Sequence, residues 1–206
     1  MVQKQMAMKK ILVIDNRDSF VYNIVEYLRR MPEVEVQVVC DDGKTSLPCT
    51  DSFWGIVLSP GAGVPEEYVL MREVLDGRVR ETMPVLGICL GMQAMVTVSG
   101  GQLRLLPVPR HGHPSRLCFC WDRPAMFASI PEGTQVGRYH SWVVDEAALP
   151  GCWNLVARDE EGNVMVVVRK DRPWTGLQFH PESIMSPLGF DMLQAWVRTL
   201  PPPEWT

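Results

Sequence analysis

The sequence predicts an α/β fold: an open, mostly parallel sheet with helices on both faces, and β-rich antiparallel additions in the second half. In the first half, short continuous apolar runs of strand length alternate with stretches of helical periodicity. From about residue 103, strand-like stretches follow one another with turn residues between them. With 206 residues, 46% of them hydrophobic, we expect a single domain over residues 1–206.

The first strand is expected at Ile11–Ile14, an apolar run without alternation that suits a strand covered on both faces. Asp15–Ser19 then offers capping oxygens, and apolar residues recur at helical spacing from Phe20 until Met31 and the proline after it. Further elements of this half are predicted at Val34–Val39, Gly55–Leu58, Tyr68–Arg80 (helix), Val85–Ile88 and Met92–Val98 (helix).

The second half is predicted to be antiparallel. Glu161–Asn163 contains the Gly-Asn pair of a hairpin turn between two apolar runs. The expected strands are Leu117–Trp121, Thr134–Tyr139, Trp153–Arg158, Val164–Arg169 and Gly176–Phe179. A closing amphipathic helix is predicted at Leu188–Leu200, before three prolines.

Composition argues against several classes of protein. The net charge of −4 and pI near 5.6 lack the basic surplus that binds nucleic acid or an anionic membrane. No window approaches the roughly 20 apolar residues of a membrane span, and the run after Lys10 is too short for a signal peptide. We therefore expect a cytoplasmic protein.

The six cysteines contain no C-x-x-C pair, which disfavours a zinc ribbon or a thioredoxin-type redox site. In a reducing compartment most of them are expected to be small buried hydrophobes. His111 and His113 are a weak pair by themselves, and no cluster has metal-ligand spacing. We expect neither a metal nor a cofactor.

The most informative segment is Gly87-Ile88-Cys89-Leu90-Gly91, in which a buried strand meets a helix. This is the layout of a nucleophile elbow with sulfur in place of hydroxyl. The two glycines remove the Cβ atoms that would crowd the bend, so that Cys89 can adopt a strained conformation with its thiol exposed. The helix N-terminus would favour the thiolate. The alternative is a cysteine that merely packs a tight crossover.

His180 is the best candidate for the base that a cysteine nucleophile needs, because it follows an apolar strand. Glu182 lies two residues further along and can turn back to the imidazole, where a carboxylate would set the tautomer. Without Cys89, a His-Pro-Glu turn would more simply be structural.

A glycine-containing turn, Ser59–Gly63, follows the third strand. A backbone N–H of Gly63, together with that of Leu90, could stabilise an oxyanion. The segment lacks the Lys-Ser/Thr of a phosphate-binding loop, and by itself it is equally compatible with a plain turn.

Four dispersed motifs resemble those of the class I, triad-type glutamine amidotransferases, in the right order and over nearly the whole chain. They are Leu58–Gly63, Gly87–Gln93, Tyr139–Trp142 and Gln178–Ser183. The opening Ile14–Asn23 resembles the start of the glutaminase subunits of anthranilate synthase and 4-amino-4-deoxychorismate (para-aminobenzoate) synthase. The resemblance implies a flavodoxin-like fold.

The resemblance also implies glutamine hydrolysis through a thioester on Cys89, with His180 as proton donor and Glu182 orienting it. The oxyanion donors match Gly63 and Leu90. The positions that match glutamine-binding residues are Gly61, Ala62, Gly63, Gln93, Ser141 and Trp142. Gln93 lies one helical turn after Cys89. Ser141 and Trp142 are expected just beyond the end of a strand. Trp142 could alternatively be a core residue.

The resemblance to these glutaminase subunits implies delivery of ammonia to a chorismate-binding synthase subunit, which is usually a separate chain and sometimes a fusion, and which this chain is too short to contain. A separate partner chain is therefore expected, with Pro109–His113 as a loop lying toward it. The family pattern is not matched everywhere: Met92 stands in place of a usual His, and His113 in place of a Lys. Met92 suits a core position, and His113 removes the basis for a specific charged contact.

Two alternatives remain at this point. One is a cysteine peptidase-like hydrolase on a related α/β scaffold, against which Gln93 and the Ser141–Trp142 pair argue. The other is a non-catalytic binding subunit that retains the fold, which the presence of all three triad residues disfavours. The motifs do not separate the anthranilate and aminodeoxychorismate pathways.

Overall fold

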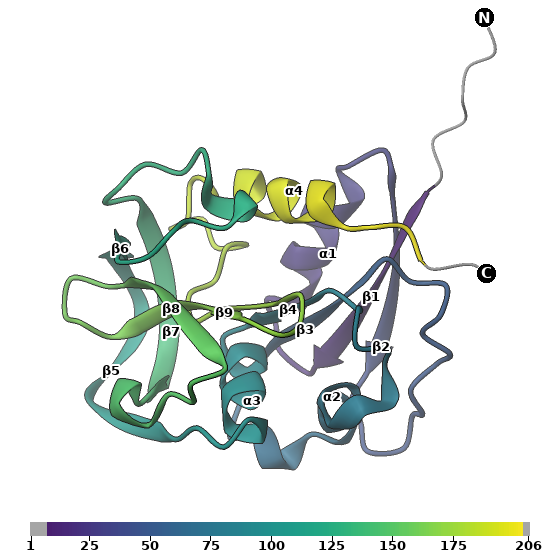
Figure 1. The fold of residues 1–206 in the computed structure, drawn as a ribbon, viewed down its shortest axis with the longest axis horizontal. Helices are drawn as coiled ribbons and strands as arrows, with labels where there is room; N and C mark the ends of the chain where they lie inside the picture. The colour runs from purple at the N-terminus through teal and green to yellow at the C-terminus, as the bar shows by residue number, and fades with distance from the viewer. Residues whose placement is uncertain (1–7, 204–206) are drawn as a thin grey trace, which may run out of the picture.

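The computed structural model describes residues 8–203, so the segment 1–7, part of the basis for excluding a signal peptide, lies outside the described residues. Within residues 8–203, eight strands form one sheet in the order β2-β1-β3-β4-β10-β9-β8-β6, and β5 and β7 form a second sheet (Figure 1). The strands are β1 (Lys9–Asn16), β2 (Val34–Cys40), β3 (Gly55–Gly61), β4 (Val85–Ile88), β5 (Leu103–Arg116), β6 (Cys118–Phe119), β7 (Gln135–Val144), β8 (Trp153–Arg158), β9 (Val164–Arg169) and β10 (Trp174–Leu177).

The predicted α/β class is confirmed. Strands β2, β1, β3, β4 and β10 are parallel, and β9, β8 and β6 continue the sheet in antiparallel fashion. The four residues Ile11–Ile14 are fully buried, as expected for a strand covered on both faces. β8 and β9 pair as the hairpin predicted around Gly162.

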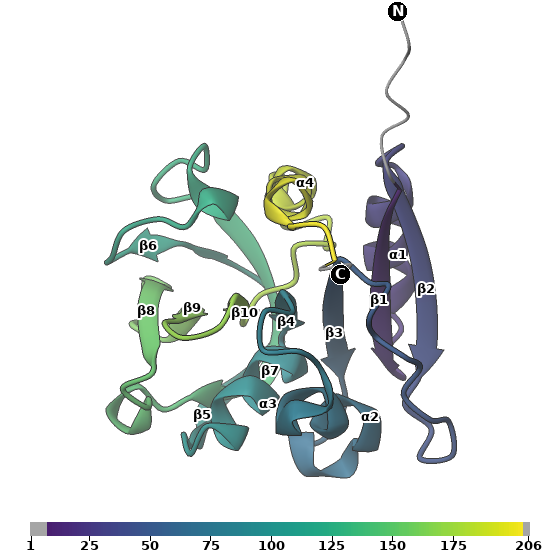
Figure 2. The ribbon, with the colours of Figure 1, turned by 45° about the vertical axis from the view of Figure 1, so that its right-hand side comes forward.

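Helices cover both faces of the sheet. The helices are α1 (Val21–Arg29), α2 (Val69–Glu73), α3 (Leu90–Val98) and α4 (Gly189–Thr199). α1 and α4 lie on one face and α2 and α3 on the other (Figures 1 and 2). The helix predicted at Tyr68–Arg80 is shorter than expected, because α2 passes into an irregular turn in which Gly77 has φ +96°.

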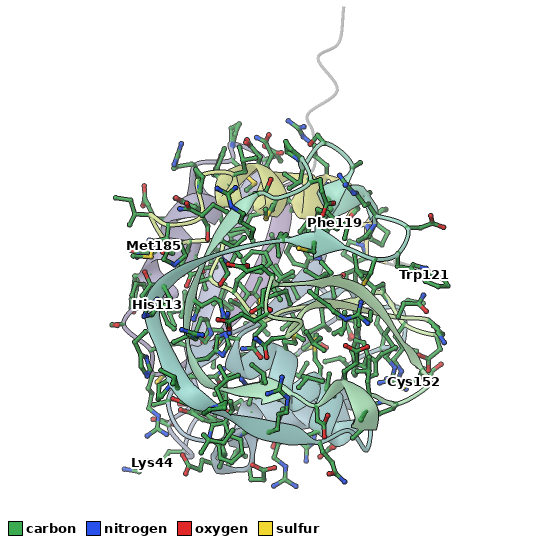
Figure 3. The ribbon with its side chains drawn as sticks, turned by 90° about the vertical axis from the view of Figure 1, so that its left-hand side faces the viewer. Lys44, His113, Phe119, Trp121, Cys152 and Met185 are labelled. Atoms are coloured by element: carbon green, nitrogen blue, oxygen red, sulfur yellow. The ribbon has the colours of Figure 1, made fainter. Side chains whose placement is uncertain are left out.

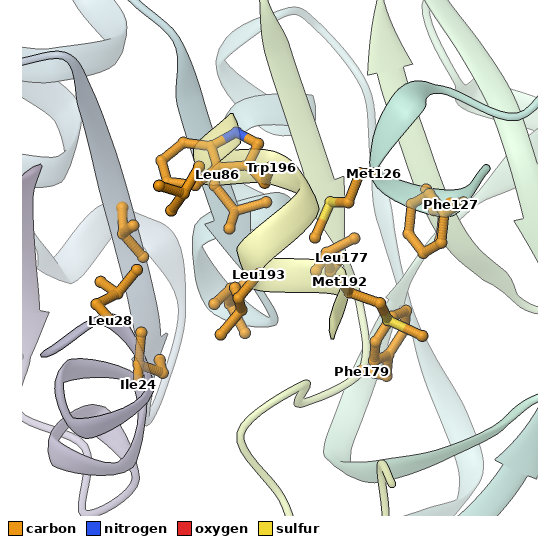
Figure 4. Close-up of a cluster of buried hydrophobic side chains, with 14 of the residues drawn as sticks. Ile24, Leu28, Leu86, Met126, Phe127, Leu177, Phe179, Met192, Leu193 and Trp196 are labelled. Carbon is orange, nitrogen blue, oxygen red and sulfur yellow. The ribbon is translucent and has the colours of Figure 1, made fainter. Parts of the chain in front are cut away.

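Each face of the sheet has its own apolar core. Ile24 and Leu28 of α1 pack with Leu193 and Trp196 of α4 above strand residues that include Leu86 (Figure 4). Against the other face, α3 contributes Met92, which is fully buried, so the apolar residue at this position is accommodated as expected. The two cores hold the carboxyl ends of β3, β4 and β10 side by side.

Strand β5 is the main departure from the predicted elements. Its residues 103–116 contain three prolines and several charges, which are typical of a loop, yet they pair with β7 through two irregularities. The predicted partner-facing loop Pro109–His113 is therefore part of a bulged strand, with Gly112 at φ +70°. His113 is exposed and lies at the same side of the molecule as Met185 (Figure 3).

The expectation that most cysteines are buried is wrong. All six lie within the described residues, and four of them are exposed: Cys40, Cys49, Cys118 and Cys120. Cys152 is half-buried and lies at the periphery (Figure 3). Cys89 is the buried one. The exposed cysteines lie at the end of β2 (Cys40), in the loop before β3 (Cys49), and on or directly after the edge strand β6 (Cys118 and Cys120).

Among residues 8–203, none of the helices has the length and apolar character required to cross a bilayer.

Candidate active site

Cys89 occupies a sharp bend between β4 and α3. Its backbone has φ 51° and ψ −101°, a conformation that L-residues rarely adopt. A Cβ on Gly91 would lie 2.4 Å from the carbonyl oxygen of Leu58, and one on Gly87 would lie 2.6 Å from the backbone of Gly91. Both glycines are therefore required for the approach of α3 to the strands, as the elbow motif predicts. Leu90, the first residue of α3, has a backbone N–H without an intrahelical acceptor.

The Cys89 side chain opens into a pocket of about 310 Å³. Because Cys89 is only 6% exposed, its thiol is more enclosed than expected and is reached through this pocket. The pocket is lined by Gly61, Ala62, Gly63, Cys89, Gln93, His111, Tyr139, His140, Ser141 and Trp142. All six residues matched to glutamine binding are among them.

His180 and Glu182 form the predicted pair. The Nδ1 atom of His180 lies 2.6 Å from Oε1 of Glu182, and both side chains are buried. The imidazole packs edge-on against the rings of Phe20 and Tyr139, at centroid distances of 5.6 and 5.0 Å, and these two rings also contact each other at 4.9 Å. The backbone N–H of His180 donates to the carbonyl oxygen of Gly137 at 2.9 Å, and this hydrogen bond attaches the turn to β7. The ring orientation is thus determined from several sides.

The charge state of His180 follows from these neighbours. Burial lowers the pKa of His180, but the Glu182 carboxylate and the nearby Cys89 thiol outweigh burial, and the pKa is raised well above its ordinary value of 6.5. Within residues 8–203, the buried Nε2 atom of the ring has no hydrogen-bond partner. The imidazole is therefore suited to hold a proton next to the sulfur.

The glycine loop after β3 forms another wall of the pocket. Asn16 holds the end of β3 in place, since its backbone N–H donates to Ser59 Oγ at 2.9 Å and its side chain to the Ser59 carbonyl at 2.8 Å. The hydroxyl of Tyr68 donates to the carbonyl oxygen of Ala62 at 2.8 Å. Gly63 has φ +72°, a conformation that favours glycine.

Gln93 and the Ser141–Trp142 pair meet across the pocket. The Nε2 atom of Gln93 donates to the Trp142 carbonyl oxygen at 2.9 Å. Ser141 and Trp142 lie inside β7, not beyond a strand end as expected, because β7 extends to Val144. With 36% of its surface exposed, Trp142 is not a core residue.

A buried polar cluster behind the pocket was not predicted. The Arg138 guanidinium lies 2.5 Å from the Asp159 carboxylate and donates from Nε to His140 Nε2 at 3.2 Å. Burial, followed by the charges of Arg138 and His180, lowers the pKa of His140 to about 3. His140 is therefore neutral at physiological pH, although it neighbours a protonated histidine.

Several residues that contact the pocket or the sulfur received no individual role from the sequence, although Tyr139, His140 and Gln178 lie within the matched motifs. His111, Tyr139 and His140 line the pocket, and the amide of Gln178 lies 3.6 Å from Cys89 Sγ. For Gln178 there was a usable indication, because an amide between Leu177 and Phe179 in a buried strand requires a polar partner. His111 had none, because its strand resembles a loop.

The family model for "Glutamine amidotransferase class-I" matches residues 12–200 of this chain. The chain belongs to this family. The resemblance inferred from the motifs is thereby confirmed.

Curated relatives agree with this class-I amidotransferase assignment. The chain is 36% identical over 193 residues to anthranilate synthase component 2 of Azospirillum brasilense, covering 92% of this chain and 95% of the relative. It is 35% identical over 190 residues to aminodeoxychorismate/anthranilate synthase component 2 of Bacillus subtilis, covering 92% and 96%. A solved glutamine amidotransferase from Thermotoga maritima shares the fold, with a TM-score of 0.78 at 17% identity over 93% of this chain and 99% of that one.

Proposed function

We propose that this class-I glutamine amidotransferase hydrolyses L-glutamine and delivers the ammonia to a chorismate-using synthase subunit carried on a separate chain. The observation that carries the proposal is the position of the His180–Glu182 pair beside Cys89 at the elbow, with the glycine loop and Gln93 lining the pocket into which Cys89 opens. A thiol, an oriented imidazole and a cavity open to solvent are the requirements of thioester chemistry on a small amide.

In the proposed reaction the Cys89 thiolate attacks the side-chain carbonyl carbon of glutamine, and the C–N bond breaks as His180 gives its proton to the departing nitrogen. The products are ammonia and a thioester on Cys89. Water, deprotonated by His180, then attacks the thioester, releasing glutamate and regenerating the thiol. Glu182 stabilises the imidazolium at 2.6 Å throughout.

The oxyanion formed in both steps is assigned to the backbone N–H groups of Gly63 and Leu90. Gly63 lies on the pocket wall, and the N–H of Leu90 is at the N-terminus of α3, directly after the nucleophile. Donors preorganised at such positions are worth about 3–4 kcal/mol of transition-state stabilisation each.

The substrate site is assigned to Gly61, Ala62, Gly63, Gln93, Ser141 and Trp142, all of which line the pocket. Because the Gln93 amide donates from Nε2 to the Trp142 carbonyl, its Oε1 atom is the one left to accept from the α-ammonium group of glutamine. This arrangement favours an amino-acid substrate over an extended peptide.

The partner is proposed from the relatives, which are named as components of anthranilate synthase and of aminodeoxychorismate/anthranilate synthase. The Bacillus relative's name covers both products, so the two pathways are equally supported. Identifying the synthase subunit that co-purifies with this chain from its own cell extract would separate them.

The test is Cys89→Ala in the complex with that subunit. Glutamine-dependent product formation should be abolished and ammonia-dependent formation retained, because only cleavage of the amide needs the thiolate. Cys118→Ala, at an exposed cysteine remote from the pocket, is the matched control. A Cys89→Ala complex that uses glutamine at the parental rate would disprove the proposal.

A further inference from the structure

Gln178 is a buried amide directly beside the sulfur of Cys89. It follows β10, is fully buried, and its backbone N–H donates to the Met165 carbonyl oxygen at 2.8 Å. Its side-chain Nε2 atom lies 3.6 Å from Cys89 Sγ, within hydrogen-bond range for sulfur. A primary amide in a dry interior requires partners for both its donor and its acceptor atoms, and here one of these partners is the sulfur.

The direction of this hydrogen bond is determined by a chain of contacts that begins at a backbone carbonyl. The Trp142 carbonyl oxygen can only accept, so the atom of Gln93 at 2.9 Å from it is the amino group Nε2. The same Nε2 lies 3.3 Å from Gln178, which must present Oε1 to it. The remaining amide atom, the Nε2 donor of Gln178, therefore faces the sulfur, and the reverse orientation would place two donors together.

We propose that Gln178 is a positioning residue that donates an N–H to the sulfur of Cys89, holds it as the thiolate, and couples it to Gln93 in the substrate pocket. The proposal rests on the assignment of Cys89 as the nucleophile. A hydrogen bond to an ionised group in a water-poor site is stronger than one to the neutral group, so this donor favours the thiolate. The Gln178 donor approaches the sulfur from the end of β10, whereas the N-terminus of α3 approaches it from the helix side.

This arrangement also gives the pocket a connection to the nucleophile. Gln93 Nε2 is shared between the Trp142 carbonyl and Gln178 Oε1, so a substrate that orders Gln93 also orders the donor to sulfur. Removing the Gln178 amide is therefore expected to remove a hydrogen-bond partner from both the Cys89 sulfur and the Gln93 side chain. A substitution elsewhere in β10 should leave both hydrogen bonds in place.

The experiment compares Gln178→Met, which removes the donor at similar volume, with Gln178→Glu, which replaces it by a carboxylate of the same shape. Alkylation of Cys89 by iodoacetamide is followed against pH by mass spectrometry of the tryptic peptide 81–104, in which Cys89 is the single cysteine. Circular dichroism checks that each variant is folded. The control is Thr175→Val, a half-buried position three residues earlier in the chain.

The pH midpoint of alkylation should rise by roughly one to two units in Gln178→Met, as expected for loss of a hydrogen bond to a charged group. It should rise further in Gln178→Glu, because a carboxylate repels the thiolate, and stay unchanged in Thr175→Val. If Gln178→Met does not fold, Gln178→Leu, which also lacks the donor, takes its place in the comparison. Midpoints equal to the parent's, or a lower one for Gln178→Glu than for Gln178→Met, would overturn the proposal.

Glutamate release is measured on the same preparations. A fall in kcat that parallels the shift in midpoint supports the positioning role. A parent protein that alkylates as expected but releases no glutamate would instead count against the proposed function, so the two failures are distinguishable.

Discussion

Replacing Glu182 by glutamine is the most direct perturbation of the His180 environment, because it keeps the side-chain shape and removes the charge. The carboxylate lies 2.6 Å from Nδ1, and both side chains are almost completely buried. Removing one member of such a buried pair typically costs about 3–5 kcal/mol. If that cost falls on the imidazolium form needed for catalysis, it corresponds to a roughly 10²- to 10⁴-fold loss of kcat at about 1.4 kcal/mol per tenfold.

The assay is glutamate release under saturating glutamine, with and without the synthase subunit. Glu26→Gln, which removes the same charge from an exposed position on α1, should leave kcat unchanged. Ammonia-dependent product formation by the complex should also be unchanged, because the synthase subunit is not altered. A Glu182→Gln protein with kcat within threefold of the parent would refute the assigned role of the carboxylate.

The same substitution has a signature in stability. Because the native pKa of His180 is raised above its unfolded value, its protonated ring stabilises the fold below about pH 6.5, and this contribution is lost as the pH rises through the native pKa. The difference in free energy of unfolding between the parent and Glu182→Gln should therefore be largest below pH 6.5 and shrink at alkaline pH. A difference independent of pH would show that the pair does not titrate as inferred.

Two further predictions concern the elbow and the cluster behind it. Gly91→Ala places a methyl group 2.4 Å from the Leu58 carbonyl oxygen. It should lower the free energy of unfolding, measured by urea denaturation, by about 1–3 kcal/mol and abolish most of the glutaminase activity. Gly151→Ala, at a position with open space around it, should change neither. His140 has a native pKa of about 3, so it contributes stability that is complete above about pH 6.5 and lost as the pH falls toward 3. His140→Gln keeps an acceptor for Arg138 but does not titrate. In this variant the free energy of unfolding should therefore fall less steeply between about pH 6.5 and about pH 3, by the slope that one bound proton contributes. An unchanged slope would contradict the prediction.

Much of the site was readable locally. The Gly-x-Cys-x-Gly spacing around Cys89 predicts a sharp bend between strand and helix, and the structure contains that bend. His180 and Glu182 are separated by one proline, so their contact depends on a single turn. In both cases the interacting groups lie within a few residues of each other, and short-range backbone geometry decides the outcome.

What the amino-acid pattern did not show is the part that depends on pairing between distant segments. Residues 103–116 have the prolines and charges of a loop and become a strand because β7 supplies hydrogen-bond partners about 20 to 40 residues further along the chain. The pairing of β7 with β5 also decides which face of β7 carries Trp142, whose side chain is exposed and not part of the core.

By itself, then, the sequence determined the α/β class and the elbow, and it pointed to the cysteine and histidine proposed as nucleophile and base, since these follow from local periodicity and from residue types with specific chemistry. Only the tertiary structure decided that Gln178, 89 positions from Cys89, donates to its sulfur, and that Arg138 and Asp159 lie buried behind the pocket. The physical reason is that burial and hydrogen-bond partners of a polar side chain are set by the order of strands in a sheet. That order is a property of the whole chain and not of any short segment.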